Sequence, residues 1–454
     1  MKSVLSLLPL LLCPVCVQAA DDVQMVLNRA LDAAQEQQSE NMGPVISAVL
    51  DASGGDEQVF WSSMQRAAEA GHPVALTWQA RQRLAQLRSQ QVPIESAEAA
   101  VKLRAAVEQA AAAGYAPALL EMAHLCGSGV GAPADEKQGM EYLMQACRSG
   151  SPRARAAYLL ISGRLEKEGK DSPAVVAELK RNNYFVEEML ASLEASRDEA
   201  ASREWMELAA SHGSPGAAGM LAFYYLQQGK EALAYDFLKQ AAERDHPEAL
   251  AQLAAFSVPG AEVPEGLKPL ITPDAPQAVR LFQRAALQGY TPALIPLAGE
   301  YHKQPEQFPA SRVFDLYRRA ADAGDPRGGV AYAYCLAAGR GCAPDAARGV
   351  RVLQQLVDAG VPFANLALAD LYFNGTGVEA DMARALQSLS AAAAAGVPQS
   401  YTLMAVLAQL GNASRASEPS RARVYLRMAQ ERGEINPEGA FEEMVRLGSW
   451  KFMP

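Results

Sequence analysis

Several residue types and motifs are scarce in this sequence of 454 residues, and each scarcity excludes a class of protein. Acidic residues outnumber basic ones, giving a net charge of −10, and Lys and Arg form no cluster with interleaved aromatic residues. We therefore expect no nucleic-acid partner. The five histidines lack the spacing of a zinc motif, and the phosphate-binding loop, the nucleophile elbow and any Ser-x-x-Lys motif are missing. These absences predict a protein that is not an enzyme and has no cofactor.

Long apolar runs are also missing, except at the N-terminus. The stretch from Val4 to Val17 follows the basic Lys2 and is too short to span a membrane. Val17 and Ala19 occupy the small-residue positions of a cleavage signal. We predict a signal peptide over residues 1–19, export to the periplasm or the cell exterior, and a soluble mature protein without a membrane span.

Cysteine is sparse, and two of the six cysteines lie in the predicted leader. An exported protein would carry the other four in an oxidising compartment. Cys335 and Cys342 are close enough in sequence and predicted topology to form a candidate disulfide. Cys126 and Cys147 are predicted near opposite ends of an antiparallel helix pair, too far apart to bridge. We interpret both as small buried hydrophobic residues.

Alanine, by contrast, is abundant and belongs to a repeat. The pattern Ala-Ala-x-x-Gly, first seen as Ala67-Ala68 before Gly71, recurs along the chain. The repeated glycine stands at Gly71, Gly114, Gly150, Gly213, Gly289, Gly324, Gly360, Gly396 and Gly433, and Asp245 replaces it once. The most regular glycines, from Gly324 to Gly396, are 36 residues apart. Small residues let helices approach closely, and glycine can adopt the left-handed conformation that ends a helix.

Each repeat also contains signals for a helical hairpin. A proline usually follows the glycine by two or three residues, as Pro73 follows Gly71, and proline suits the first turn of a helix. Three repeats then carry a glycine pair and an aspartate, which predict a tight turn and a helix cap. These are Gly129/Gly131/Asp135, Gly339/Gly341/Asp345 and Gly375/Gly377/Asp381. One face of each hairpin is apolar, so neighbouring hairpins must stack to bury it.

These residues resemble the Sel-one-like repeats, a family related to the tetratricopeptide repeats, in its secreted bacterial type. Its pattern is matched by Leu368-Ala369, Tyr372, Gly375-Thr376-Gly377-Val378 and Asp381, and the resemblance covers roughly residues 57–433. It implies an all-α fold, a right-handed α/α superhelical solenoid of about nine to ten stacked hairpins with a period of about 36 residues. Ankyrin repeats are a competing interpretation, although their Thr-Pro-Leu-His motif is absent.

Interruptions of the repeat suggest the domain boundaries. The interval between Gly150 and Gly213 is 27 residues longer than the period, which predicts a helical insertion. This insertion either patches a junction between repeats or projects toward a partner. We predict a signal peptide at 1–19, N-terminal capping helices at 20–56, repeats at 57–163, the helical insertion at 164–198, repeats at 199–433 and a C-terminal cap at 434–454.

Two functions remain open at this point. The resemblance implies a non-catalytic extracytoplasmic scaffold or adaptor, a monomer that binds protein partners on the concave face of the solenoid. Phe223, Tyr334, Phe363 and Phe373 are aromatic residues that the repeat pattern does not require, so they are candidate partner-binding anchors. Packing between repeats is the alternative for each. The second function is binding or hydrolysis of cell-wall material, which a cluster of paired carboxylates would favour.

Overall fold

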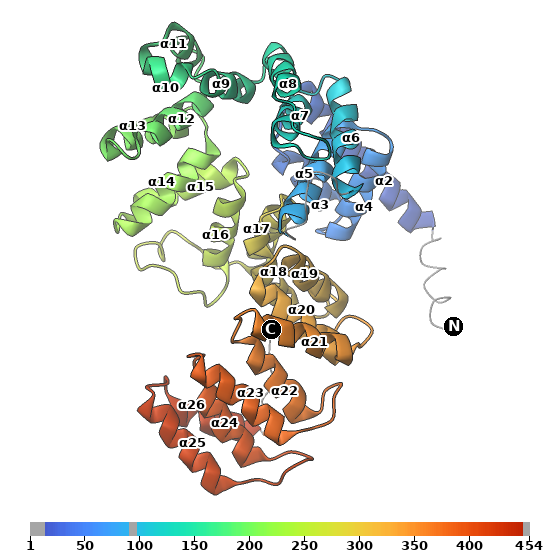
Figure 1. Ribbon diagram of the computed structural model, residues 1–454, viewed down its shortest axis with the longest axis vertical. Helices are drawn as coiled ribbons and strands as arrows, with labels where there is room; N and C mark the ends of the chain where they lie inside the picture. The colour runs from blue at the N-terminus through green and yellow to red at the C-terminus, as the bar shows by residue number, and fades with distance from the viewer. Residues whose placement is uncertain (1–13, 90–97, 448–454) are drawn as a thin grey trace. The chain divides into compact units, whose positions relative to one another are not determined.

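The computed structural model describes residues 14–89 and 98–447. The chain divides into two compact units, Met1–Ala293 and Leu294–Pro454. Apart from one isolated bridge between Asn412 and Arg415, the regular elements in the described ranges are helices (Figure 1). This confirms the all-α prediction. Most of the predicted signal peptide and the last residues of the predicted C-terminal cap lie outside the described residues.

The first unit contains the N-terminal helices and the repeats up to residue 293. Its elements are α2 (Pro14–Glu36), α3 (Gly43–Ala52), α4 (Glu57–Glu69), α5 (Pro73–Ser89), α6 (Glu98–Ala112), α7 (Ala116–Ser128), α8 (Glu136–Arg148), α9 (Pro152–Ile161), α10 (Arg164–Glu168), η1 (Gly169–Asp171), α11 (Pro173–Leu179), α12 (Tyr184–Glu194), α13 (Glu199–Ser211), α14 (Pro215–Gln227), α15 (Glu231–Glu243), α16 (Pro247–Ser257), α17 (Ala275–Leu287) and η2 (Thr291–Ala293).

The second unit continues the same helical pattern. Its helices are α18 (Leu294–His302), α19 (Ala310–Asp322), α20 (Pro326–Ala338), α21 (Ala346–Asp358), α22 (Ala364–Asn374), α23 (Met382–Ala394), α24 (Ser400–Leu410), α25 (Pro419–Glu431) and α26 (Pro437–Leu447). In both units successive helices pack as hairpins, such as α7 with α8 and α20 with α21, and each hairpin contacts the next. The predicted stacking of helical hairpins is confirmed.

The helix boundaries follow the repeat signals. The nine repeated glycines have φ between +70° and +100°, the left-handed region in which a side chain is strained. Pro73 and Pro215 begin α5 and α14, as proline does when its missing N–H falls in the first turn. The Asp135 carboxylate accepts a hydrogen bond from the backbone N–H of Gln138 at 2.9 Å and so caps α8.

The predicted insertion, residues 164–198, contains the helical elements α10, η1, α11 and α12. Helix α12 packs against α13. Glu178 of α11 is buried and accepts hydrogen bonds from Arg155 at 3.0 Å, Arg181 at 2.5 Å and Asn183 at 2.8 Å. Burial by itself would raise the pKa of Glu178, but the bonds from Asn183 and the arginines outweigh it and lower that pKa. The bond from Arg155 ties the insertion to α9.

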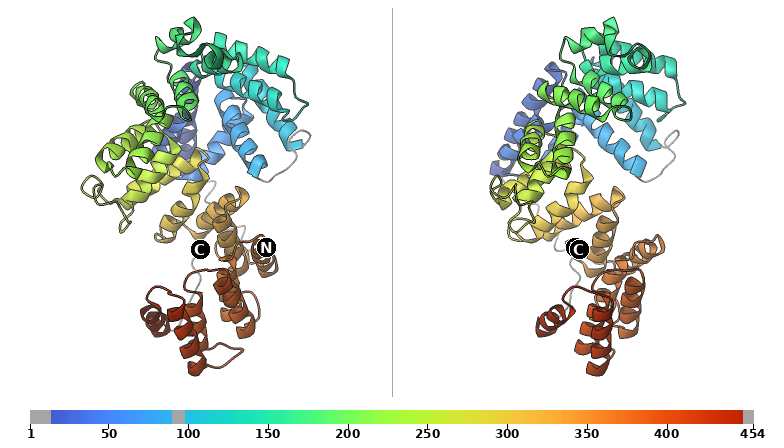
Figure 2. Two further views of the ribbon diagram at one scale, coloured as in Figure 1. Left: turned by 60° about the vertical axis from the view of Figure 1, so that its left-hand side comes forward. Right: turned by 90° about the vertical axis from the view of Figure 1, so that its left-hand side faces the viewer.

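The two ends of the first unit meet at α3. Helices α2 and α3 form a hairpin whose Leu27 and Ile46 are fully buried, and α3 also contacts α17 (Figures 1 and 2). Asp51 pairs with Arg280 at 2.9 Å. A Cβ at Gly43 would overlap the carboxylate of Asp245, the residue that replaces the repeat glycine. Helix α3 therefore connects the beginning of this helical array with its end.

Candidate interaction surface

The first unit contains a cavity of about 1120 Å³ that is partly open to solvent. Its lining comes from α5, α7, α9 and α12, together with α8. Small-molecule sites usually measure roughly 300–1,000 Å³. A space of this size has room for a peptide segment or a helix.

Apolar side chains in and beside the cavity are unusually exposed. Ile161 of α9 lines the cavity and is 61% exposed. Ala157 of α9 also lies in the lining. Met220 of α14 occupies the same repeat position as Ala157, because each stands five residues after the proline that begins its helix. Met220 and Phe223, one turn apart on α14, are 61% and 64% exposed. Met220 therefore lies on the face of α14 that corresponds to the cavity-lining face of α9, although α14 itself is outside the lining.

Three arginines give the cavity its cationic groups. Arg81 and Arg88 lie seven residues apart on α5, and Arg153 lies in the first turn of α9. The Nε atom of Arg81 is 3.0 Å from Oε2 of Glu121. The Nη2 atom of Arg88 donates a hydrogen bond to Nε2 of His124 at 2.8 Å, since a guanidinium has no acceptor atom.

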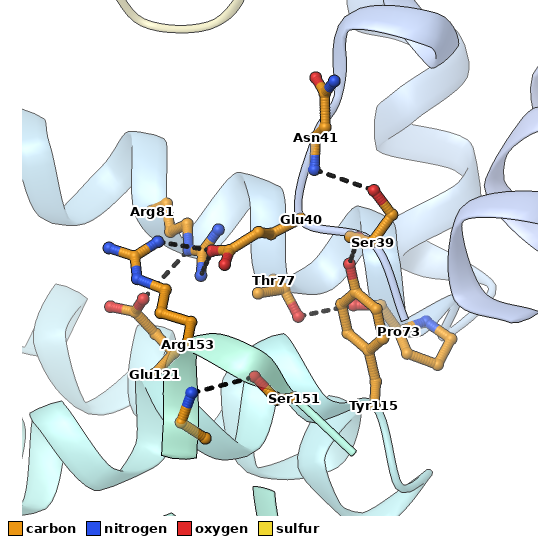
Figure 3. Close-up of polar contacts among 11 residues, drawn as sticks. Ser39, Glu40, Asn41, Pro73, Thr77, Arg81, Tyr115, Glu121, Ser151 and Arg153 are labelled. Carbon is orange, nitrogen blue, oxygen red and sulfur yellow. Dashed lines mark hydrogen bonds and ion pairs between the residues drawn. The ribbon is translucent and has the colours of Figure 1, made fainter. Parts of the chain in front are cut away.

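The loop between α2 and α3 lies against this wall of the cavity (Figure 3). The Glu40 carboxylate is 2.7 Å from Nη1 of Arg153 and 3.5 Å from Nη2 of Arg81. The Tyr115 hydroxyl donates a hydrogen bond to the carbonyl oxygen of Ser39 at 2.5 Å. One side of the loop is therefore held by residues that are 41 to 113 positions away in the sequence.

The electrostatics of these contacts follow from their surroundings. Burial tends to lower the pKa of Arg81, but Glu40 and Glu121 raise it overall. Burial raises the pKa of the Tyr115 phenol, so the hydroxyl keeps its proton and remains a donor. The side chains of Glu40, Arg81 and Arg153 are 26%, 32% and 50% exposed, and ion pairs with this much solvent contribute about 0–1 kcal/mol each.

The comparison with protein families gives one match. The Sel1 repeat model matches residues 116–151, 190–214, 247–290, 314–325, 330–360 and 362–397. The chain therefore contains six segments of Sel1 repeat sequence between residues 116 and 397. None of the curated proteins matches it.

Solved structures with a similar chain include several Sel1 repeat proteins. One is c5321, a protective antigen of uropathogenic Escherichia coli with an SLR fold, which is 17% identical with a TM-score of 0.43. The match covers 96% of this chain and 98% of that one. A Sel1 repeat protein from Oxalobacter formigenes is 22% identical, with a TM-score of 0.40, over 54% of this chain and 96% of that one. The immunity protein Pa5087 from Pseudomonas aeruginosa is 14% identical, with a TM-score of 0.33, over 47% of this chain and 84% of that one.

The four aromatic residues predicted as partner anchors of this Sel1 repeat protein fall in different environments. Phe223 is exposed on α14 in the first unit, whereas Phe363 is half-buried in the second unit. Tyr334 and Phe373 are only 2% and 5% exposed and pack in the cores of the second unit. The Tyr334 hydroxyl donates a hydrogen bond to the buried Asp370 carboxylate at 2.5 Å. Tyr334 and Phe373 therefore take the alternative given above, packing between repeats, and Phe223 stays a predicted anchor.

The candidate disulfide between Cys335 and Cys342 is not formed in this structure, where both are free thiols. The Cys342 sulfur points at the carbonyl oxygen of Cys335, 3.6 Å away. Burial raises the pKa of Cys335 to about 12. The thiolate needed to form a disulfide is therefore rare at neutral pH. Cys126 is buried, as predicted, and Cys147 is half-buried.

Sequence reasoning missed the loop residues Gln38, Ser39 and Glu40. They lie outside the repeat, and no periodic pattern connects them with Tyr115, Ala116 and Arg153, which they contact. One signal was available, because Asp245 breaks the glycine pattern. It does so at φ +62°, where its carboxylate lies against Gly43 and pairs with Arg284. A departure from a repeat can thus mark a contact with a distant segment.

Proposed function

We propose that this Sel1 repeat protein is a non-catalytic scaffold that binds a protein partner in the cavity of its first unit. The observation that carries the proposal is exposed apolar surface, formed by Ile161 in the lining of the cavity and by Met220 and Phe223 on α14, outside that lining. Exposed apolar patches of this kind, rimmed by charged groups, are typical of surfaces that bind other proteins. Phe223 supplies a large apolar side chain of the type that dominates binding energy at such surfaces.

The alternative, action on cell-wall material, has less support from the cavity. Such chemistry needs an acid and a base held ready for a substrate. Of the three carboxylates in the lining, Glu121 is paired with Arg81, Glu188 accepts a hydrogen bond from the Ser214 hydroxyl, and Glu136 lies in the first turn of α8. Among the described residues, no group of three or more His, Cys, Asp and Glu side chains is placed to hold a metal ion.

The proposal includes export, with the signal peptide ending at Ala19. The buried positions described in α2 begin at Val23, so cleavage there would leave the core contacts of the hairpin in place. In the described part of the chain, no helix combines the length and apolar character of a membrane span. Mass spectrometry of the protein recovered from its native compartment should find Ala20 at the N-terminus. Recovery of a chain that still begins at Met1 would contradict cleavage of a signal peptide after Ala19.

The binding proposal is tested by affinity capture from a cell extract with matched surface variants. Ile161→Glu places a charge in the cavity, whereas Leu233→Glu changes an apolar residue of α15 that is 40% exposed and outside the lining. Loss of an apolar anchor weakens binding by about tenfold or more. We expect Ile161→Glu to lose the captured protein and Leu233→Glu to retain it, and Phe223→Ala tests whether the binding surface extends to α14. Equal capture by all variants, or capture of glycans alone, would refute the proposal.

A further inference from the structure

The loop that follows α2 contacts the cavity wall as a bound peptide would. Three of its consecutive residues each use a different kind of contact. The backbone N–H of Ala116, at the start of α7, donates a hydrogen bond to Oε1 of Gln38 at 2.6 Å. Tyr115 donates to the backbone carbonyl of Ser39, and Arg81 and Arg153 pair with the Glu40 carboxylate. Backbone recognition combined with a charged side-chain contact is how proteins bind extended peptide segments.

These contacts come from separate repeats. Arg81 belongs to α5, Tyr115 precedes α7 and Arg153 lies in α9, so the wall is built whether or not the loop occupies it. The charged groups are partly exposed, which makes each ion pair weak. The flanking helices are anchored separately, by buried Leu31 on one side and Ile46 on the other. The loop can therefore leave the wall while the hairpin stays in place.

We propose that Arg81, Tyr115, Arg153 and the Ala116 amide form a binding site for an extended acidic peptide segment of a partner, which the chain's own Gln38–Glu40 fills in its absence. This inference rests on the proposed function, because it assigns a partner chemistry to the same cavity. The loop acts as a competing ligand held within the same chain. A partner with a stronger acidic segment displaces it.

The position of Arg88 makes the partner chemistry more specific. Arg88 lies seven residues after Arg81 on α5, also in the lining, which places the two about 10 Å apart along the helix axis. An extended peptide covers this distance in about three residues. The only hydrogen-bond partner of Arg88 in the described part of the chain is His124. The preferred segment therefore carries a second acidic residue about three positions from the first.

The test uses synthetic peptides in place of the unknown partner. The first peptide copies residues 37–44 with blocked ends, so that Glu40 is its single carboxylate. The second carries Glu40→Gln, and the third carries Gly43→Glu to add an acidic residue three positions later. Binding to the purified chain is followed by fluorescence anisotropy. In the unaltered chain the loop competes at an effective concentration in the millimolar range, so the first peptide should bind weakly.

Removing the loop side chains that occupy the site should make peptide binding detectable. In a Gln38→Ala/Glu40→Ala chain we expect the first peptide to bind at least about tenfold more tightly than in the unaltered chain, because the competing state is removed. The second peptide, or an added Arg153→Ala change, should abolish this gain. The third peptide should bind more tightly than the first, and Arg88→Ala should cancel the difference. Circular dichroism checks that every variant folds.

The outcomes separate this inference from the proposed function. If the emptied and folded chain binds the first and second peptides equally, or neither, the acidic-peptide site is refuted. Loss of the captured partner with Ile161→Glu would still leave the proposed function standing. If the double variant does not fold, hydrogen exchange at residues 37–42 of the unaltered chain replaces it. Excess third peptide should then accelerate exchange there, and unchanged exchange would overturn the inference.

Discussion

Replacing Gly377 by alanine tests how closely the turn between two helices must approach the preceding repeat. Gly377 has φ +70°, and a Cβ there would lie 2.6 Å from the carbonyl oxygen of Ala337 and 2.7 Å from the Cβ of Ala346. Favourable contacts between heavy atoms are about 3.5–4.0 Å long. Because the first obstacle is a backbone atom of α20, the new methyl group would displace one hairpin from its neighbour.

Gly396 offers a matched control in the same unit. Its φ of +79° is close to that of Gly377, but a Cβ there would meet nothing within 4 Å. Gly396→Ala should therefore lower the free energy of unfolding by the left-handed strain alone, about 1–2 kcal/mol. Gly377→Ala adds the displacement of packed backbone, about 1–3 kcal/mol more. Its total effect should be about 2–5 kcal/mol.

Urea unfolding followed by circular dichroism measures both changes. We expect the midpoint of Gly377→Ala to fall clearly below that of Gly396→Ala, with native spectra for both variants in the absence of urea. Since repeats are stabilised by their neighbours, the loss should spread to adjacent hairpins. Equal shifts in the two variants would show that only the backbone conformation of Gly377 matters, and would refute the packing argument.

Three further predictions concern buried polar groups. Tyr334→Phe removes a donor to the buried Asp370 carboxylate, so it should lower the free energy of unfolding by about 1–3 kcal/mol, and a change below about 0.5 kcal/mol would contradict this. In the native protein at pH 8, maleimide should label Cys342 much faster than Cys335, whose pKa is raised to about 12; equal labelling by mass spectrometry would show that Cys335 is accessible. The lowered pKa of Glu178 contributes stability that is complete above about pH 4.5 and is lost as the pH falls through the folded-state pKa. Glu178→Gln should therefore weaken the acid dependence of unfolding, and an unchanged dependence would exclude Glu178 as its source.

The repeat signals predicted local structure well because each acts within a few residues. Gly396 needs a left-handed backbone, Pro215 fits a first helical turn and Asp135 caps the helix that follows it. These preferences hold wherever the hairpin lies in the array. The stacked hairpins could therefore be predicted from one sequence.

The anchor residues were harder to predict because exposure depends on neighbouring helices. Phe223 and Tyr334 both lie on the first helix of a repeat hairpin, yet one is 64% exposed and the other is buried. Tyr334, on α20, packs against residues of α21 and α22, and its hydroxyl donates a hydrogen bond to Asp370 on α22. Periodicity shows that a helix has an apolar face, but not which side chains the next hairpin covers.

The sequence by itself determined the helices, their ends and their pairing into hairpins, because backbone conformation and short-range capping are encoded locally. Only the tertiary structure decided that Glu40 meets Arg153 and that Asp245 lies against Gly43. Small rotations from one hairpin to the next add up over many repeats, so contacts between distant repeats depend on the whole array. The candidate binding site arises from such contacts, and for this reason it was invisible in the pattern of any single repeat.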